Sequence, residues 1–193
     1  MRVIAVAFFA SVIAMSCQKQ VVKEKPYVDF DSLVNVQIAH LKTSNASLKK
    51  EATIGDQTSS SSTVPDSASW SHELDVFRQL DLINRPIYQN AYTIKSGVKD
   101  SKSNLLVRSF EAPGNSAVPY LRLYYQDTPL RLKKLEALYQ EANSLYGSQR
   151  KLEMYFDDTT GPSYLKGYLI EGDQKMMLSD SVHYSIRSEI VFQ

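Results

Sequence analysis

Apolar and polar side chains alternate with a period of two along residues 118–192. Successive side chains of a strand point to opposite faces of a sheet, so this period predicts strands with one buried and one polar face. Short connectors separate the alternating segments, and connectors this short join antiparallel neighbours. We therefore predict an up-and-down β-meander, with turns rich in Gly, Pro, Asn or Asp at residues 112–115, 127–129, 160–162, 171–173 and 179–181.

Before residue 87 the apolar positions follow the period of amphipathic helices. One stripe predicts a helix over residues 31–42, capped by Asp29 or Asp31, with an extension to residue 48 as the alternative. A second stripe predicts a helix over residues 69–83, which Pro86 stops. The stripes consist of Phe30, Leu33, Val34, Ile38 and Leu41 in the first helix, and Trp70, Leu74, Phe77, Leu80 and Ile83 in the second.

This change of period predicts an α+β fold, with two N-terminal helices packed on a twisted antiparallel meander that can take the form of a half-barrel. Residues 48–54, 87–98 and 104–111 add three strand predictions. Residues 55–69 contain four consecutive serines and are predicted to be a mobile hairpin tip or loop. The alternation slips near Lys133 and Lys134, which indicates a bulge, and a further turn is expected at residues 143–144 or 147–148.

The start of the chain has the layout of a secretory signal. Arg2 is followed by an apolar run from Val3 to Ala14, which is shorter than the roughly 20 apolar residues of a spanning helix. We therefore divide the chain into a signal peptide at residues 1–16, a polar tether at residues 17–26 and one domain at residues 27–193. Removing 16 of the 193 residues leaves 177, enough for one domain with its own core.

Cys17 is the single cysteine of the chain, so it has no intramolecular disulfide partner. The sequence Ala14-Met15-Ser16-Cys17 resembles the lipobox of bacterial lipoproteins. That resemblance implies a lipid on Cys17 and a location on the outer membrane, with the periplasmic face expected because no acidic run follows the cysteine. An ordinary signal peptide that happens to contain a cysteine is the alternative. More loosely, the order of helix, polar hairpin, second helix and meander resembles small uncharacterised envelope lipoproteins of Bacteroidota, a resemblance that implies no activity.

The mature chain carries 21 basic and 21 acidic side chains once Arg2 is removed from the 22 Lys and Arg of the whole chain. No basic patch interleaved with aromatic residues is visible, so no nucleic-acid partner is expected. The expected partners are the membrane, through the lipid on Cys17, and an apolar ligand or another envelope protein.

The sequence lacks the nucleophile elbow, the phosphate-binding loop, the dinucleotide fingerprint, paired cysteines and the calcium loop. His40, His72 and His183 are scattered, and Val76 stands where a zinc helix beginning at His72-Glu73 would need its second histidine. Asp157 and Asp158 fit a turn better than a carboxylate pair. We therefore expect no catalytic residues, no metal, no cofactor and no enzyme activity.

Tyrosine is enriched in the second half of the chain. It suits a half-buried pleated surface, and it also suits an aromatic-lined concavity for an apolar or glycan ligand. Two functions stay open: a non-enzymatic scaffold or interaction domain of the envelope, and a module that binds an apolar ligand or lipid in a curved-sheet cavity. The tyrosines concerned are Tyr120, Tyr124, Tyr125, Tyr139, Tyr146, Tyr155, Tyr164, Tyr168 and Tyr184.

Overall fold

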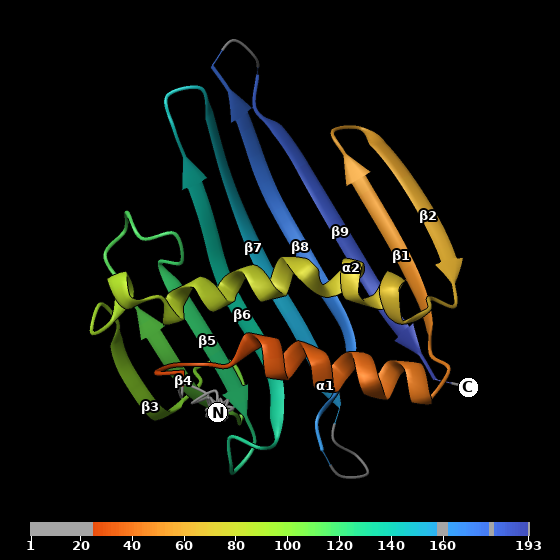
Figure 1. Cartoon of the computed structure of the whole chain (residues 1–193), viewed down its shortest axis with the longest axis horizontal. Helices are drawn as coiled ribbons and strands as arrows, with labels where there is room; N and C mark the ends of the chain where they lie inside the picture. The colour runs from red at the N-terminus through yellow and green to blue at the C-terminus, as the bar shows by residue number, and fades with distance from the viewer. Residues whose placement is uncertain (1–24, 158–161, 178–179, 193) are drawn as a thin grey trace, which may run out of the picture.

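A computed structural model describes residues 25–157, 162–177 and 180–192. Within these residues, nine strands form one antiparallel sheet and two α-helices accompany it (Figure 1), which confirms the α+β class. The strand order is β2-β1-β9-β8-β7-β6-β5-β4-β3. The strands are β1 Ser47–Ile54, β2 Gln57–Thr63, β3 Thr93–Lys99, β4 Leu106–Glu111, β5 Tyr120–Tyr125, β6 Leu132–Ala142, β7 Tyr146–Asp157, β8 Tyr164–Met176 and β9 Val182–Val191.

Both helices begin at an aspartate that caps their first turn. The Asp29 carboxylate accepts a hydrogen bond from the Ser32 N–H at 3.0 Å, and helix α1 spans Phe30–Thr43. The Asp66 carboxylate accepts from the Ser69 N–H at 2.8 Å, and helix α2 spans Ser67–Arg78. Each cap satisfies a backbone donor that the helix itself leaves unpaired.

Helix α1 ends at Thr43, within one residue of its predicted end at 42. The alternative extension to residue 48 is wrong, because Asn45 has a positive φ of 48° and turns the chain into β1. Helix α2 tightens at its end into the 3-10 helix η1, Gln79–Asn84, and a second 3-10 helix, η2, covers Pro86–Tyr88.

Helices α1 and α2 lie across the same face of the sheet, called here the helix-covered face (Figure 1). The rings of Phe77 in α2 and Tyr168 in β8 meet edge to face with centroids 5.7 Å apart. The Gln37 side chain in α1 accepts a hydrogen bond from the Leu165 N–H of β8 at 2.8 Å. Apolar side chains fill this layer, and the following are fully buried: Phe30, Val34, Leu41, Trp70, Leu74, Phe77, Phe110, Leu121, Leu135 and Leu165.

The prediction of a loop over residues 55–69 is wrong, because Gln57–Thr63 forms strand β2. Gly55, with a positive φ of 55°, provides the reversal from β1, and β2 then pairs with β1 in one unbroken register from Ile54↔Gln57 to Leu48↔Thr63. A serine run has little apolar surface to bury, but a neighbouring strand still supplies hydrogen-bond partners for its backbone. Low sequence complexity therefore did not mean an irregular backbone here.

The predicted turn at residues 171–173 is also wrong, since these residues lie inside β8. Gly172 pairs with Arg150 on one side and with Tyr184 on the other. A Cβ atom at position 172 would lie 2.5 Å from the Tyr184 ring. The glycine therefore makes room for an aromatic side chain and does not mark a turn.

The strand predicted over residues 87–98 begins later, at Thr93, because Asn90 has a positive φ of 64°. The turn near residue 143 is confirmed, and the Asn143 side chain accepts hydrogen bonds from the backbone N–H groups of Leu145 and Tyr146. The bulge is confirmed as well, because Tyr124 pairs with Lys134 while Tyr125 pairs with Leu132.

Candidate functional site

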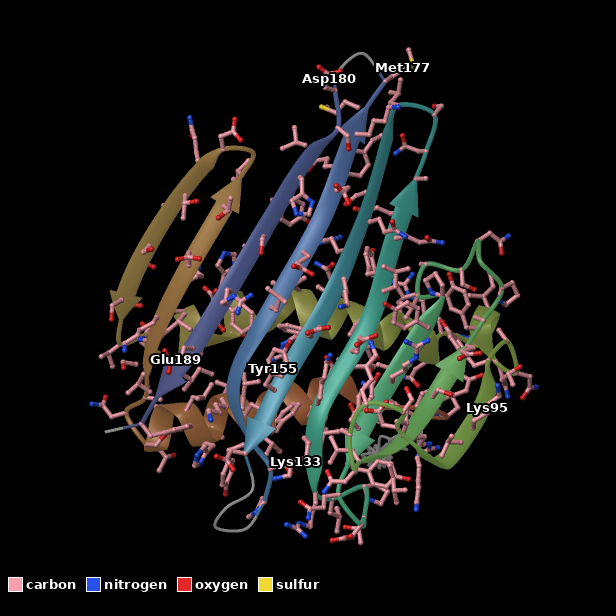
Figure 2. The ribbon with its side chains drawn as sticks, turned by 180° about the vertical axis from the view of Figure 1, so that it is seen from behind. Lys95, Lys133, Tyr155, Met177, Asp180 and Glu189 are labelled. Carbon is pink, nitrogen blue, oxygen red and sulfur yellow. The ribbon has the colours of Figure 1, made fainter. Side chains whose placement is uncertain are left out.

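The sheet face opposite the helices, called here the uncovered face, carries a chain of paired charges. Figure 2 views this face, and no helix among the described residues crosses it. The Lys134 ammonium lies 3.0 Å from the carboxylates of both Glu136 and Glu153. Arg122 adds an ion pair to Glu136 at 3.3 Å, and Lys151 adds one to Glu153 at 2.7 Å. The cluster formed by these five residues, called here the charge ladder, joins strands β5, β6 and β7.

Glu153 is the most buried member of the charge ladder, with a side chain only 4% exposed. Burial alone would raise the pKa of its carboxyl, but hydrogen bonds from Lys151, Tyr155 and Lys134 offset that effect and hold the pKa at about 2. The Tyr155 hydroxyl donates to Glu153, and burial together with this hydrogen bond raises the pKa of Tyr155 to about 12. Glu153 is therefore ionised and Tyr155 is neutral across the physiological range, a pattern typical of an ordered polar network.

Tyrosine rings of the uncovered face lie beside the cations of the charge ladder. The Lys134 ammonium is 5.6 Å from the Tyr124 ring centroid and 5.7 Å from that of Tyr155. The Arg122 guanidinium is 4.5 Å from the Tyr120 ring centroid. These distances are within the range of cation–π attraction, so the rings stabilise the cations where they stand.

A groove of about 940 Å³ opens on the uncovered face beside the charge ladder and crosses from β2 to β7. Tyr155, which Figure 2 labels near the middle of this face, stands at one side of the groove, and the half-buried Leu169 contributes apolar surface. Serines of β2 form the other side. Charged residues from three strands complete the lining: Lys49, Lys50 and Glu51 from β1, Lys166 from β8, and Arg187 and Glu189 from β9.

The charges of the groove differ from those of the charge ladder. In the register of β1 and β9, Lys49 is opposite Glu189 and Glu51 is opposite Arg187. Lys50 is paired with Glu73 of α2 at 2.9 Å, but none of the other five charged groups of the groove forms an ion pair within 4 Å among the described residues. All five are exposed, so their charges are accessible to a ligand of either sign.

A second polar cluster lies at the start of the domain. Asp29, Asp31 and Asp81 place carboxylate oxygens within 4.8 Å of one another, and no other His, Cys, Asp or Glu group in the described ranges has this spacing. The Lys25 ammonium stands between them, at 2.9 Å from Asp29 and 2.7 Å from each of the other two. Burial would lower the pKa of Lys25, but the three carboxylates raise it above its ordinary value. The Lys25 ammonium thus occupies the position that a metal ion would take. Its ion pairs connect the chain before α1 to η1.

The three histidines lie in separate surroundings. His40 in α1 stacks on Tyr164 at 3.4 Å between ring centroids, and burial lowers its pKa. His72 is exposed on α2. His183 in β9 points to the polar face, as the alternation predicted, and its ring nitrogen lies 3.1 Å from the Asp173 carboxylate. No pair of histidines shares a cluster within the described residues.

The tyrosines that the sequence grouped together are divided between the two faces. Tyr168 lies in the core and donates to Glu73 of α2, while Tyr139 and Tyr184 pack at the edge of the core. Trp70 is fully buried, as a core anchor should be. The sequence did not identify Lys49, Lys166 and Arg187 as groove residues. Each is a single charge on a different strand, and no sequence pattern shows that the three lie close together in the sheet.

Cys17, the tether before residue 25 and Asp158 lie outside the described residues. None of the helices described is long and apolar enough to cross a membrane. Comparisons of the chain with protein-family models, with curated proteins and with solved structures find no match in any of the three.

Proposed function

We propose that this protein is a lipid-anchored, non-enzymatic interaction domain of the cell envelope, and that it binds an extended segment of another envelope protein in the groove of the uncovered face. One observation carries the proposal: five of the six charged groups of the groove make no ion pair within 4 Å with described residues, whereas every member of the adjacent charge ladder is paired. Charges without a close ionic contact beside an ordered network are suited to steering and orienting a polar partner.

The packing of the helix-covered face supports an interaction domain over a module with an internal cavity. Trp70, Leu74 and Phe77 are fully buried there, together with side chains of α1. An apolar ligand would have to displace these side chains. The groove, in contrast, is accessible without rearrangement of the core. In this proposal the sheet has the half-barrel form that the sequence allows, with its helices on one side and its binding surface on the other.

Site-specific photocrosslinking in living cells tests the groove. A photoreactive residue at Leu169, inside the groove, should give a discrete crosslinked product, and Arg187→Glu in the same chain should abolish it because that change reverses a charge of the lining. The matched control is the same photoreactive residue at Leu130, which is 85% exposed and lies outside the groove. Equal products from both positions, or none from Leu169, would contradict the proposal.

The membrane anchor rests on Ser16-Cys17 and the signal-like start, and it can be tested separately. Cys17→Ser should leave an unprocessed precursor that takes up no labelled palmitate, since the thiol that receives the lipid is gone. Processing and membrane fractionation of this variant at the parental level would show instead an ordinary secreted domain.

The absence of catalysis is also part of the proposal. Esterase, phosphatase, glycosidase and peptidase substrates should give only background turnover with the purified protein. Turnover that disappears on substitution of His40, His72 or His183 would overturn it.

A further inference from the structure

The two edge strands of the sheet are built differently. Edge strand β3 contains two lysines, Lys95 and Lys99, and an irregularity between Lys95 and Val98 where Gly97 has a positive φ of 71°. Charges and bulges of this kind prevent an edge from pairing with another strand. Lys95 is labelled at this edge in Figure 2.

Edge strand β2 has none of these protections. Its sequence, Gln57-Thr58-Ser59-Ser60-Ser61-Ser62-Thr63, contains no charge, no proline and no glycine. It pairs with β1 without a register shift, and all seven of its residues are exposed. Among the described elements, β1 is the one strand that neighbours it, and its outer side is open at the margin of the sheet (Figure 1). Alternate backbone N–H and C=O groups of β2 therefore point away from the sheet without a strand to receive them.

We propose that β2 pairs antiparallel with β2 of a second copy of this chain, which joins the two sheets edge to edge about a twofold axis. In antiparallel pairing, two residues that face each other either both direct their N–H and C=O groups toward the other strand or both direct them away. Their residue numbers therefore have the same parity, and a twofold axis perpendicular to the sheet passes through one residue and not between two. Centring on Ser60 gives the largest overlap and places Ser60 opposite Ser60 and Thr58 opposite Ser62. Hydroxyl side chains then face one another along the seam, where Ser and Thr pairs form cross-strand hydrogen bonds.

The second copy fits this edge better than an unrelated strand does. In a twofold interface residue i faces residue j and residue j faces residue i, and the residue on the axis faces its own equivalent, so a charge at residue 60 would meet a like charge. The strand carries hydroxyl and amide side chains alone, which satisfies that condition. The charges nearest to β2, on β1, include both signs in Lys49, Lys50 and Glu51. The polar seam also gives no apolar anchor by which a different partner would be selected.

The position of the chain start agrees with the same symmetry. Lys25 forms ion pairs with Asp29 and Asp31 at the start of α1 and with Asp81 in η1, on the helix-covered face of the sheet. A twofold axis perpendicular to the sheet keeps both helix layers on one side. Lys25 of both copies therefore lies on the same side, so two anchored copies can share one membrane while their grooves face away from it.

Disulfide formation in the full-length chain tests the register. Ser60→Cys should form a crosslinked dimer on mild oxidation of membranes, because residue 60 faces itself across the axis. Ser62→Cys alone should not, but Ser62→Cys mixed with Thr58→Cys should, because these positions face each other. The matched control is Ser96→Cys on the other edge strand, β3, which should give no more dimer than the parent chain.

A charge introduced at the seam tests the association itself. The parent chain in detergent should have a protein mass of about twice that of one chain, as a twofold dimer requires. Ser60→Glu should halve that mass, since two carboxylates would then face each other, and Ser96→Glu should leave it unchanged. Ser60→Lys, which repels with the opposite sign, is the second variant if Ser60→Glu fails to fold.

Two outcomes would overturn the inference: a parent chain that is monomeric in detergent, or disulfide dimers that form as readily through residue 96. Neither outcome depends on a partner in the groove. A failure here is therefore distinguishable from a failure of the proposed function.

Discussion

The two faces of the sheet bury side chains by different physical means. On the helix-covered face, Trp70 and Phe77 lose all contact with water because α2 lays apolar surface against the strands. On the uncovered face, the Glu153 side chain is only 4% exposed although no described helix covers it. Lys134, Lys151 and Tyr155 surround the carboxylate and satisfy it. An open sheet face can therefore hold an ordered, buried network when its own long side chains both cover the network and supply its hydrogen-bond partners.

The largest expected effect comes from the helix-covered face. Trp70→Ala should lower the free energy of unfolding by about 3–5 kcal/mol, because a large buried side chain leaves a cavity. Trp70→Phe should cost less than about 1.5 kcal/mol, since it retains an aromatic ring and the indole N–H has no acceptor among the described residues. Urea denaturation measures both. The control is Leu169→Ala on the uncovered face, expected to cost about 1 kcal/mol because this side chain is half-buried.

On the uncovered face, Glu153→Gln should cost about 2 kcal/mol, because it weakens charge-assisted hydrogen bonds to Lys134 and Lys151. Glu189→Gln on the same face is the matched control. Glu189 is exposed and has no ion pair within 4 Å among the described residues, so its change should be within about 0.5 kcal/mol. Equal losses in the two variants would mean that the charge ladder contributes nothing particular to the fold.

The same carboxylate predicts a dependence of stability on pH. The pKa of Glu153 falls from 4.5 to about 2 on folding, so its contribution is fully present above pH 4.5 and is lost as the pH falls toward 2. The free energy of unfolding of the parent chain should therefore decline more steeply across this window than that of Glu153→Gln. Parallel curves for the two proteins, recorded by urea denaturation at each pH, would contradict the assignment.

The smallest effect is expected at the chain start. Lys25→Ala should cost about 1 kcal/mol, since it removes a partly exposed cation from three carboxylates. Added salt should reduce the loss by screening the repulsion that remains. Lys95→Ala is the control, because Lys95 is exposed on β3 and makes no ion pair within 4 Å with described residues. A loss that salt leaves unchanged would show that Lys25 acts through packing instead.

The sequence predicted those elements whose signal is local. The stripes of apolar residues located α1 and α2. Asp29 was one of the two predicted cap residues, and its side chain is the one that accepts a hydrogen bond from the first turn of α1. Period-two alternation located the long strands and the outward direction of His183. It failed where pairing or packing within the sheet decides: β2 is a strand because its backbone pairs with β1, and Gly172 lies within β8 because the Tyr184 ring occupies the space beside it.

The candidate site was less accessible to sequence reasoning than the fold. Lys49, Lys166 and Arg187 come from three strands that only the sheet order brings together. The expectation of a tyrosine-lined surface pointed to Tyr155, but composition could not separate it from Tyr168, which lies in the core. The charge of an individual residue is visible in a sequence, whereas its lack of an ionic partner is a property of the folded chain.

The strand order also determines the order in which the strand pairs can form during folding. The hairpin of β1 and β2 is made early, yet the neighbour that holds it in the sheet is β9, with Ser47 paired to Val191. Closing a loop of this length is slow compared with forming local contacts, and it must await the synthesis of β9. The hairpin therefore lacks its main neighbour until β9 has been made. A chain shortened by its last strand would leave two adjacent strands unanchored, so the C-terminal residues determine when the N-terminal hairpin becomes protected from proteases.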